Sequence, residues 1–301
     1  MENVLQVNNL NKEFNNKPVL KDINFVIPKG KIIGLVGPNG AGKTTIMKSI
    51  LTLTTSKGKI SILGESISLS SHKVLSKVGA LIEAPAIYPF LSGLDHLNLF
   101  AAKTTTQEDI HRLVISLKME KYIKNKAKRY SLGMKQKLGI ALALLNKPEL
   151  VILDEPMNGL DPQANKDFRD LLLKLKQAGV TILISSHILS ELQKVADSLL
   201  IINHGQIIQE ASMADILVAN SYLSISTDSD GKAKELLNSV GFSLLPDEQI
   251  RVKEDADTKV SEIISLLEKH DIEINDISHQ SSDLENSLLE LLSEDQTRED
   301  K

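Results

Sequence analysis

A glycine-rich stretch near the N-terminus has the residue types and the spacing of a phosphate-binding loop. The residues GPNGAGKTT, 37–45, match the pattern G-x-x-x-x-G-K-[ST] in full, after the apolar run IIGLV and before TTIMKSI, which has helical spacing. Glycines let the backbone wrap a phosphate without Cβ clashes, and N–H groups at a helix N-terminus stabilise its charge. We therefore predict that a nucleotide is bound by Pro38, Asn39, Gly40, Ala41, Gly42, Lys43, Thr44 and Thr45.

Charged and hydroxyl side chains in and after this loop could carry out phosphate chemistry. Lys43 is expected to reach the β and γ phosphates, and the Thr44 hydroxyl is expected to help hold Mg²⁺. A second apolar run, LVIL, ends in Asp154 and Glu155, as a buried strand does when it places carboxylates at the edge of a sheet. Asp154 is predicted to hold Mg²⁺, directly or through water, and Glu155 to act as the general base on the attacking water.

A histidine follows a third apolar run at the same predicted sheet edge. His187 ends the stretch LISSH. A histidine after a strand is usually structural, but beside Glu155 and a γ-phosphate it could contact the transition state. The sequence therefore predicts a catalytic role for His187 together with Glu155.

The elements that must position these residues follow a strand–loop–helix alternation. Short β-rich runs fill residues 3–63, helical spacing dominates residues 91–145, and the alternation returns from residue 149 to residue 203. Such an alternation predicts an α/β fold with a mostly parallel sheet covered by helices, into which the helical block is inserted. We predict a first domain over residues 1–214, with a helical subdomain at about 91–145.

The pattern changes after about Asp215. The stretches SYLSIST, KAKELLNSVG, FSLLP, QIRVKE, KVSEIISLLEKH and IEINDI indicate a βαββαβ order, which is typical of a small ferredoxin-like domain. A final helix, DLENSLLELL, is expected before a charged tail. We therefore predict an α+β accessory domain over residues 215–293 and a disordered tail over residues 294–301. A regulatory or dimer-stabilising role and a simple packing role both remain open for this domain.

Composition limits the classes of protein to which the chain can belong. The 301 residues carry a formal net charge of −4, which gives no reason to expect nucleic acid as the main partner. The absence of cysteine excludes disulfides, thiolate zinc sites and iron–sulfur clusters. The N-terminus lacks the pattern of a secretory signal, and no apolar run approaches the ~20 residues of a membrane span. If the protein works at a membrane, another protein must hold it there.

Taken together and in this order, the motifs resemble those of the nucleotide-binding subunit of an ATP-binding cassette (ABC) transporter over residues 4–215. GPNGAGKTT matches the Walker A motif, LVILDE the Walker B motif and NGLDP the D-loop. The resemblance implies a P-loop ATPase with ATP and Mg²⁺ as cofactors. It also implies that Asp161 is the D-loop aspartate, that His187 is the switch histidine and that Phe14 stacks on adenine.

The family signature LSGGQ aligns with residues 130–134, YSLGM, of which Ser131 and Gly133 match. The resemblance implies that these two residues contact the γ-phosphate held by the opposite subunit of a dimer. Ser131 can cap a helix, and the Gly133 N–H lies at its N-terminus, where an anion is stabilised. The partner is expected to be a second copy of the chain or a paired nucleotide-binding subunit.

A second departure from the family lies in the Q-loop, where Glu83 stands in the place of glutamine. Glu83 could approach Mg²⁺ through an oxygen, but it adds a charge and donates no hydrogen bond when ionised. The same loop meets the membrane subunit in this family, so residues 83–90 are the candidate coupling surface. The glutamate, the altered signature and the C-terminal domain together resemble ATPases of exporters for bacitracin and lantibiotic-type peptides.

The predicted function is therefore an ATP-hydrolysing subunit that lies on the cytoplasmic face of the membrane and powers a separate integral permease. Export of, or resistance to, peptide antibiotics is the expected process. The alternative is a soluble ABC ATPase that acts on ribosomes or nucleic acid, although the chain has one P-loop and no sustained heptad run. A P-loop kinase or GTPase is set aside, because no N-K-x-D motif follows the P-loop.

Overall fold

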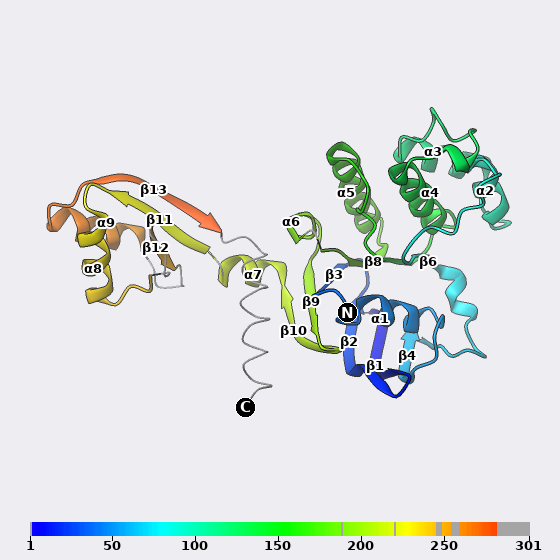
Figure 1. Cartoon of the computed structure of the whole chain (residues 1–301), viewed down its shortest axis with the longest axis horizontal. Coiled ribbons are helices and arrows are strands. Elements are labelled where there is room, and N and C mark those ends of the chain that lie inside the picture. Colours follow the sequence, from blue (N-terminus) through cyan, green and yellow to red (C-terminus); the bar gives the residue numbers. More distant parts are fainter. Residues whose placement is uncertain (1, 188, 220, 245–248, 254–258, 282–301) are drawn as a thin grey trace. The chain divides into compact units, whose positions relative to one another are not determined.

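The computed structural model describes residues 2–187, 189–219, 221–244, 249–253 and 259–281. The chain forms two compact units, Met1–Glu210 and Ala211–Lys301 (Figure 1). In the described residues, no helix is long and apolar enough to cross a membrane.

A six-stranded sheet forms the centre of the first unit. Its strand order is β10-β9-β3-β8-β7-β6, and the pairs β9–β3, β3–β8, β8–β7 and β7–β6 are parallel. Every residue of β3, β7 and β8 is buried, as expected for central strands covered on both faces. The strands are β3 (Ile32–Val36), β6 (Val78–Leu81), β7 (Leu150–Leu153), β8 (Thr181–Ser185), β9 (Ser198–Asn203) and β10 (Gln206–Ser212).

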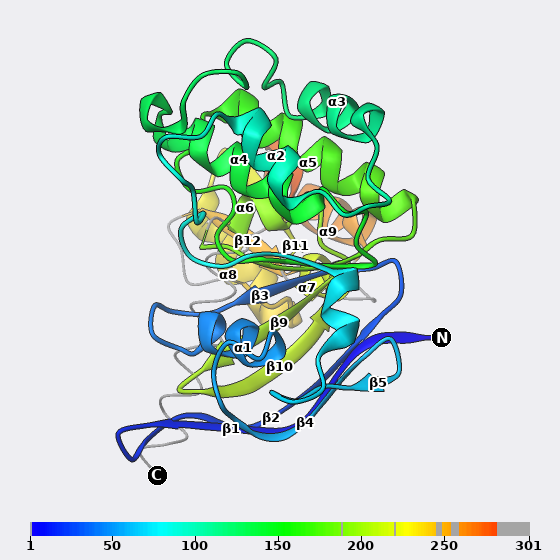
Figure 2. The same cartoon turned by 90° about the vertical axis from the view of Figure 1, so that its right-hand side faces the viewer.

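A second, four-stranded sheet packs against helix α1 (Lys43–Ile50), on the side of the helix that faces away from the six-stranded sheet. Its order is β2-β1-β4-β5, with antiparallel pairing throughout. Leu10 of β1, Met47 of α1 and Leu35 of β3 belong to one buried apolar cluster, so the helix is held between the two sheets (Figure 2). The strands are β1 (Asn3–Phe14), β2 (Lys17–Pro28), β4 (Lys57–Ile62) and β5 (Glu65–Ser66).

The opposite face of the six-stranded sheet is covered by helices. Figures 1 and 2 both show α2, α4 and α5 on this face, across the sheet from α1. Capping boxes at Ser92 and Thr106 begin α2 and α3, because each side chain accepts a hydrogen bond from the first turn. The helices are α2 (Gly93–Phe100), α3 (Gln107–Ser116), α4 (Leu132–Leu144), α5 (Pro162–Gln177) and α6 (Leu189–Leu192), with the short 3₁₀ helices η1 (Lys73–Lys77) and η2 (Ala127–Arg129).

The second unit contains an antiparallel sheet of order β12-β11-β13 and its own apolar core. Among the described residues, three of the four strands expected here form, and Leu244 of the stretch FSLLP makes an isolated bridge with Val252. The expected final helix at 283–292 and the tail at 294–301 lie outside the described residues. The elements are α7 (Met213–Ala219), β11 (Ser221–Thr227), α8 (Asp230–Val240), β12 (Ile250–Lys253), α9 (Val260–Lys269) and β13 (Ile274–Ser281).

Candidate active site

The predicted phosphate loop connects the end of β3 to the start of α1. Gly42 has a φ of 114°, and a Cβ at this position would lie 2.7 Å from the Leu20 side chain, so only glycine fits there without strain. The Lys43 Nζ atom donates to the carbonyl oxygens of Gly37 at 2.8 Å and Pro38 at 3.1 Å. The lysine therefore lies along its own loop, at the N-terminus of a helix, where a phosphate is favoured.

Asp154 lies at the end of β7 and is buried. Its Oδ2 atom accepts a hydrogen bond from the Thr44 hydroxyl at 2.7 Å, and its Oδ1 atom accepts one from the Ser185 hydroxyl, also at 2.7 Å. Burial lowers the pKa of the Lys43 ammonium, while the charges of Glu155 and Asp154 oppose this effect. The loop lysine, the loop threonine and both acids therefore form one electrostatic cluster.

Glu155 and His187 are in direct contact. The His187 Nδ1 atom lies 2.7 Å from Glu155 Oε2, and the His187 backbone N–H donates to the same oxygen at 3.2 Å. Glu155 has a φ of 49°, a left-handed conformation that is uncommon for residues other than glycine and that clusters at functional sites. The histidine thus fixes the direction of a carboxylate that stands on a strained backbone.

Phe14 lies at the end of β1, opposite Lys17 in the β1–β2 hairpin. Its side chain is 47% exposed, and the Lys12 ammonium lies 4.4 Å from the ring centroid. Farther along β2, Leu20 contacts the phosphate loop at Gly42. The hairpin therefore presents a partly exposed aromatic ring, with a cation over it, at the end of β1, while its other strand, β2, borders the phosphate loop.

Glu83 pairs with Lys48 rather than with the residues around Asp154. Its Oε1 atom lies 2.5 Å from the Lys48 Nζ atom. Lys48 is four residues after Thr44 on α1, so the two side chains share one face of the helix. Glu83 also has a φ of 57°, a left-handed conformation that differs from the extended backbone of the preceding strand β6. The ion pair places the carboxylate beside the helix that begins at the phosphate loop.

The altered signature begins α4. The Ser131 hydroxyl accepts a hydrogen bond from the Met134 N–H at 3.3 Å, and the Met134 sulfur accepts one from the Ser131 N–H at 3.4 Å. Leu132 is 66% exposed and lies against Gly159, where an added Cβ would be 2.6 Å from the leucine side chain. The methionine therefore completes a reciprocal helix cap, and the leucine covers the loop that leads to α5.

The D-loop aspartate begins α5. The Asp161 carboxylate accepts a hydrogen bond from the Ala164 N–H at 2.8 Å, and Pro162 occupies the first helical position. Both features are common helix-start signals. In addition, a Cβ at Gly133 would lie 2.8 Å from the Gly159 carbonyl oxygen, so the starts of α4 and α5 approach each other closely.

Mg²⁺ fits the donor set at Thr44 and Asp154. In the part of the chain that the structure describes, no group of three His, Cys, Asp or Glu residues could hold a metal ion. Mg²⁺ does not require such a cage, because it is usually bound by one or two carboxylates together with phosphate oxygens and water. One hydroxyl and one buried carboxylate, hydrogen-bonded to each other beside a phosphate loop, match this mode of binding.

Comparisons with known proteins show the family to which the chain belongs. Residues 20–158 match the family model for ABC transporters. The chain is 36% identical over 300 residues to the bacitracin transport ATP-binding protein BcrA of Enterococcus faecalis, and the match covers 97% of each chain. The chain belongs to the ABC transporter ATP-binding proteins. It is an ATP-binding subunit and an ATPase, as the sequence predicted, and no comparison supports the alternative of an ABC ATPase acting on ribosomes.

Two further similarities cover about 70% of this ABC ATPase. The lantibiotic transport ATP-binding protein SrtF of Streptococcus pyogenes is 44% identical over 208 residues, which cover 69% of this chain and 90% of the relative. A solved structure of the ATP-binding subunit of an ABC transporter has 32% identity and a TM-score of 0.65, and the match covers 71% of this chain and 91% of that chain. The predicted cassette fold is therefore confirmed.

Three residues of the ABC ATPase site were not found by sequence reasoning. Ser185 bridges the two acids, since its hydroxyl donates to Asp154 and accepts from the Glu155 N–H at 2.9 Å. Gln136 of α4 donates to the Pro156 carbonyl at 3.0 Å, and Lys48 holds Glu83. Ser185 lies two residues before His187 in the stretch LISSH, and Gln136 lies in the stretch KQKL after the signature. The position of each beside a predicted motif could have indicated it from the sequence.

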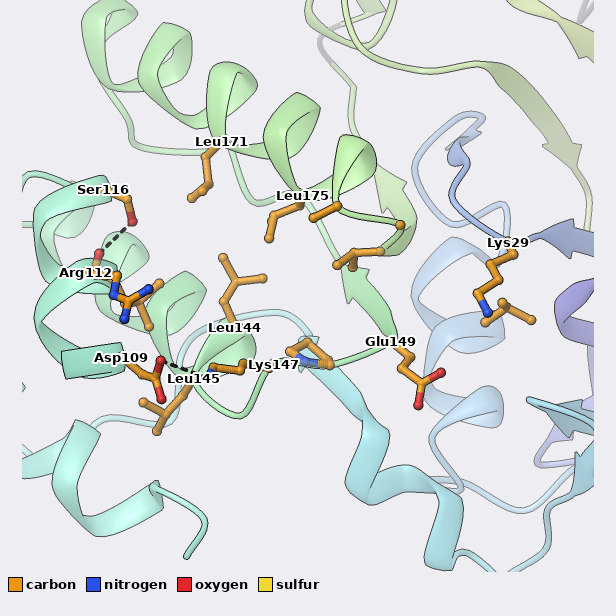
Figure 3. Close-up of a pocket in the computed structure, with 16 residues that line it drawn as sticks. Lys29, Asp109, Arg112, Ser116, Leu144, Leu145, Lys147, Glu149, Leu171 and Leu175 are labelled. Atoms are coloured by element: carbon orange, nitrogen blue, oxygen red, sulfur yellow. Dashed lines mark hydrogen bonds and ion pairs between the residues drawn. The ribbon is translucent and has the colours of Figure 1, made fainter. Parts of the chain in front are cut away.

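The ABC ATPase also has an apolar cavity of about 780 Å³ away from the residues of the site. Figure 3 shows Leu144, Leu171 and Leu175 around it, with Lys147 paired to Asp109 at 2.8 Å. Its lining also includes residues 148–149, which precede β7, and residues 178–180, which precede β8, whereas the acids and His187 follow these strands. The cavity therefore belongs to the opposite edge of the sheet.

Proposed function

We propose that two copies of this chain, or this chain and a paired nucleotide-binding subunit, enclose two ATP molecules and power a separate integral membrane permease. The observation that carries the dimer is the position of the two half-sites. Lys43 begins α1 on one face of the six-stranded sheet, and Ser131 begins α4 on the other face (Figures 1 and 2). The Ser131 and Gly133 of one chain are therefore assigned to the ATP that is held by the phosphate loop of the other.

Binding of ATP requires Lys43 to exchange its hydrogen bonds. Its Nζ atom leaves the Gly37 and Pro38 carbonyls and contacts the β and γ phosphates, and the loop N–H groups cradle the phosphate oxygens. Phe14 stacks on the adenine ring. Mg²⁺, held by Thr44 and Asp154, with Glu83 approaching it, would neutralise charge on the phosphates.

Hydrolysis uses the Glu155–His187 pair. The Glu155 carboxylate orients a water molecule and takes its proton as the water oxygen attacks the γ-phosphorus. The bond from the γ-phosphorus to the β–γ bridging oxygen breaks, and ADP and inorganic phosphate are released. His187 keeps the carboxylate directed through its 2.7 Å hydrogen bond and contacts the phosphate oxygens in the transition state.

The coupling surface is assigned to residues 83–90 and the neighbouring end of α2. Tyr88 is 46% exposed and Phe90 67% exposed. Aromatic side chains bury large apolar areas when they bind a partner, so these exposed rings support a binding surface here. A hollow of about 360 Å³ has Pro85 and Ala86 of this loop and Phe100 of α2 among its lining residues. An integral permease that inserts a segment here would hold the ATPase at the cytoplasmic face of the membrane. No nucleic acid partner is proposed.

The process assigned to the transporter is export of, or resistance to, peptide antibiotics of the bacitracin or lantibiotic type. It is supported by the similarity to BcrA over nearly the whole chain and to SrtF over 69% of it. The second unit is included in the match to BcrA, so the resemblance is not limited to the nucleotide-binding motifs.

The test is reconstitution with a candidate permease, an integral membrane protein to be sought in the reading frames beside the one that encodes this chain. The activity of the ATPase in proteoliposomes should rise when the membrane protein is present. Cells that express both the ATPase and the membrane protein should survive higher concentrations of bacitracin or a lantibiotic. The Glu155→Gln variant is the matched control, and it should abolish both effects. Activity that is indifferent to the membrane protein would contradict the transport function. Resistance that is unchanged, with activity stimulated, would contradict only the assigned cargo.

A further inference from the structure

His96 is a fully buried histidine whose two ring nitrogens both have partners. It lies on α2, with 0% of its surface exposed. The Tyr88 backbone N–H donates to its Nε2 atom at 2.9 Å, and its Nδ1 atom lies 2.7 Å from the Ser92 carbonyl oxygen. A backbone N–H can only donate and a carbonyl can only accept. The ring is therefore neutral, with its hydrogen on Nδ1 and its lone pair on Nε2.

This hydrogen bond holds the exposed end of the 83–90 loop against α2. The His96 and Tyr88 rings are stacked, with centroids 5.9 Å apart and an interplanar angle of 27°. Tyr88 is in turn 6.4 Å from Phe90, again between ring centroids. The Lys128 N–H donates to the Pro89 carbonyl at 2.9 Å. The backbone that carries the two exposed aromatic rings is thus held at Tyr88 by the buried imidazole and at Pro89 by the Lys128 N–H.

We propose that His96 is a positioning residue for the partner surface formed by Tyr88 and Phe90. By accepting the Tyr88 N–H, it keeps both rings directed outward in the arrangement that the permease binds, and so lowers the ordering cost of docking. The inference rests on the proposed function, because it takes the permease as the partner. In this proposal His96 contacts neither ATP nor the permease, but it affects how tightly the ATPase and the permease bind each other.

Two substitutions separate this role from simple packing. In His96→Gln, the side-chain oxygen can reach the former position of Nε2 and accept the Tyr88 N–H. In His96→Asn, the shorter amide can reach the former position of Nδ1 and donate to Ser92, but it leaves the Tyr88 N–H without its acceptor. Both replace an aromatic ring by an amide of similar polarity. A role in packing alone predicts similar behaviour for the two variants.

The first measurement is hydrogen exchange of the Tyr88 amide in the full-length protein. We expect slow exchange in the wild type and in His96→Gln, and exchange about fivefold faster in His96→Asn, the change that corresponds to one net hydrogen bond. Histidine nitrogen shifts provide a check that needs no variant to fold, because His96 in the wild type should carry its proton on Nδ1. A proton on Nε2 would overturn the proposal.

The second measurement is stimulation of ATPase activity by the membrane protein in proteoliposomes. Activity without the membrane protein should be unchanged in both variants, since His96 lies outside the nucleotide site. The concentration of membrane protein for half-maximal stimulation should stay near the wild-type value in His96→Gln and rise about fivefold in His96→Asn. Equal stimulation of the wild type and His96→Asn would refute the role of His96. No stimulation of the wild type would instead refute the proposed function.

Discussion

Glu155 accepts hydrogen bonds from both the ring and the backbone of His187, and this pair is where the chemistry of ATP hydrolysis is assigned. Glu155→Gln keeps the shape of the side chain but removes the basic oxygen. We expect ATP hydrolysis to fall about 10²- to 10⁴-fold, the usual contribution of a general base.

Binding of ATP to the Glu155→Gln variant should be retained, because the phosphate loop is unchanged. Phosphate release and equilibrium nucleotide binding measure the two effects separately. Lys43→Ala is the complementary control, in which binding itself should weaken. Wild-type phosphate release by the Glu155→Gln protein would show that another group takes the proton.

Glu83 and Lys48 form an ion pair between side chains that are 62% and 34% exposed. Such a pair contributes about 0–1 kcal/mol to folding, so stability alone does not explain it. If the Glu83 oxygen approaches Mg²⁺, Glu83→Ala should raise the Mg²⁺ concentration for half-maximal ATPase activity several-fold. Glu83→Gln, which keeps an oxygen, should stay near the wild type.

The control for this measurement is Lys48→Met, which removes the ion pair and leaves the carboxylate. Its Mg²⁺ requirement should not exceed that of the wild type, because the lysine no longer competes for Glu83. A Mg²⁺ titration that is identical in all four proteins would remove Glu83 from the metal site. The free energy of unfolding, measured in urea, should differ by no more than about 1 kcal/mol among them.

Residues with a chemical signature could be placed from the sequence, and their hydrogen-bond partners could not. Lys43, Thr44, Asp154, Glu155 and His187 were selected from motifs at predicted strand ends, and the fold brings them together. Lys48 and Glu83 are separated by 35 residues, and no local pattern links them. Such partners are set by tertiary packing, which the periodicity of a single sequence does not encode.

At the scale of elements, Asp197 joins the start of β3 to the end of α5. Its carboxylate accepts hydrogen bonds from the Ile32 N–H at 2.9 Å and from Lys176 at 2.8 Å, and Lys31 lies at 3.2 Å. Burial alone would raise the pKa of this carboxyl, but the hydrogen bonds from Lys176, Ile32 and Lys31 outweigh it and lower the pKa. The ionised group therefore stabilises the strand that leads to the phosphate loop.

Asp197→Asn should destabilise the protein by about 1.5–3 kcal/mol at pH 7, the range for hydrogen bonds to a charged group. Because the folded-state pKa is lowered, this contribution is present above the unfolded-state pKa of about 4 and is lost as the pH falls through the folded-state value. Urea unfolding at a series of pH values should show the two proteins converging in acid. A difference that is constant with pH would assign the effect to packing instead.

Strands and helices could be predicted from the sequence where an apolar run corresponds to a buried element. The wholly buried strands β3, β7 and β8 coincide with the apolar runs of the sequence. Short β-rich runs were expected over residues 3–63, whereas β1 is long and extends from Asn3 to Phe14. Its pairing with β2 and β4 contains irregular register shifts, and Asn9 has a φ of 49°, so neighbouring strands rather than alternation set its length.

At the scale of the whole molecule, the two units have separate cores. The apolar cluster of the first unit runs from Val4 to Ile207, and that of the second unit from Leu223 to Ile277. The cassette fold of the first unit could be predicted from the order of strands and helices, because that order permits few topologies. In the second unit, three of the four expected strands are found among the described residues. The resemblance of residues 130–134 to the family signature already implied a dimer. The placement of Lys43 and Ser131 on helices that lie across a sheet from each other supports the proposed dimer.

The central claim is that two chains build each ATP site, and the most direct test is specific ATPase activity as a function of protein concentration, with sedimentation in parallel. While the protein is mostly monomeric, each tenfold rise in concentration should raise the specific activity about tenfold, by mass action on the dimer. The activity should level off where sedimentation shows dimers. Constant specific activity across concentrations at which only monomer sediments would contradict the account.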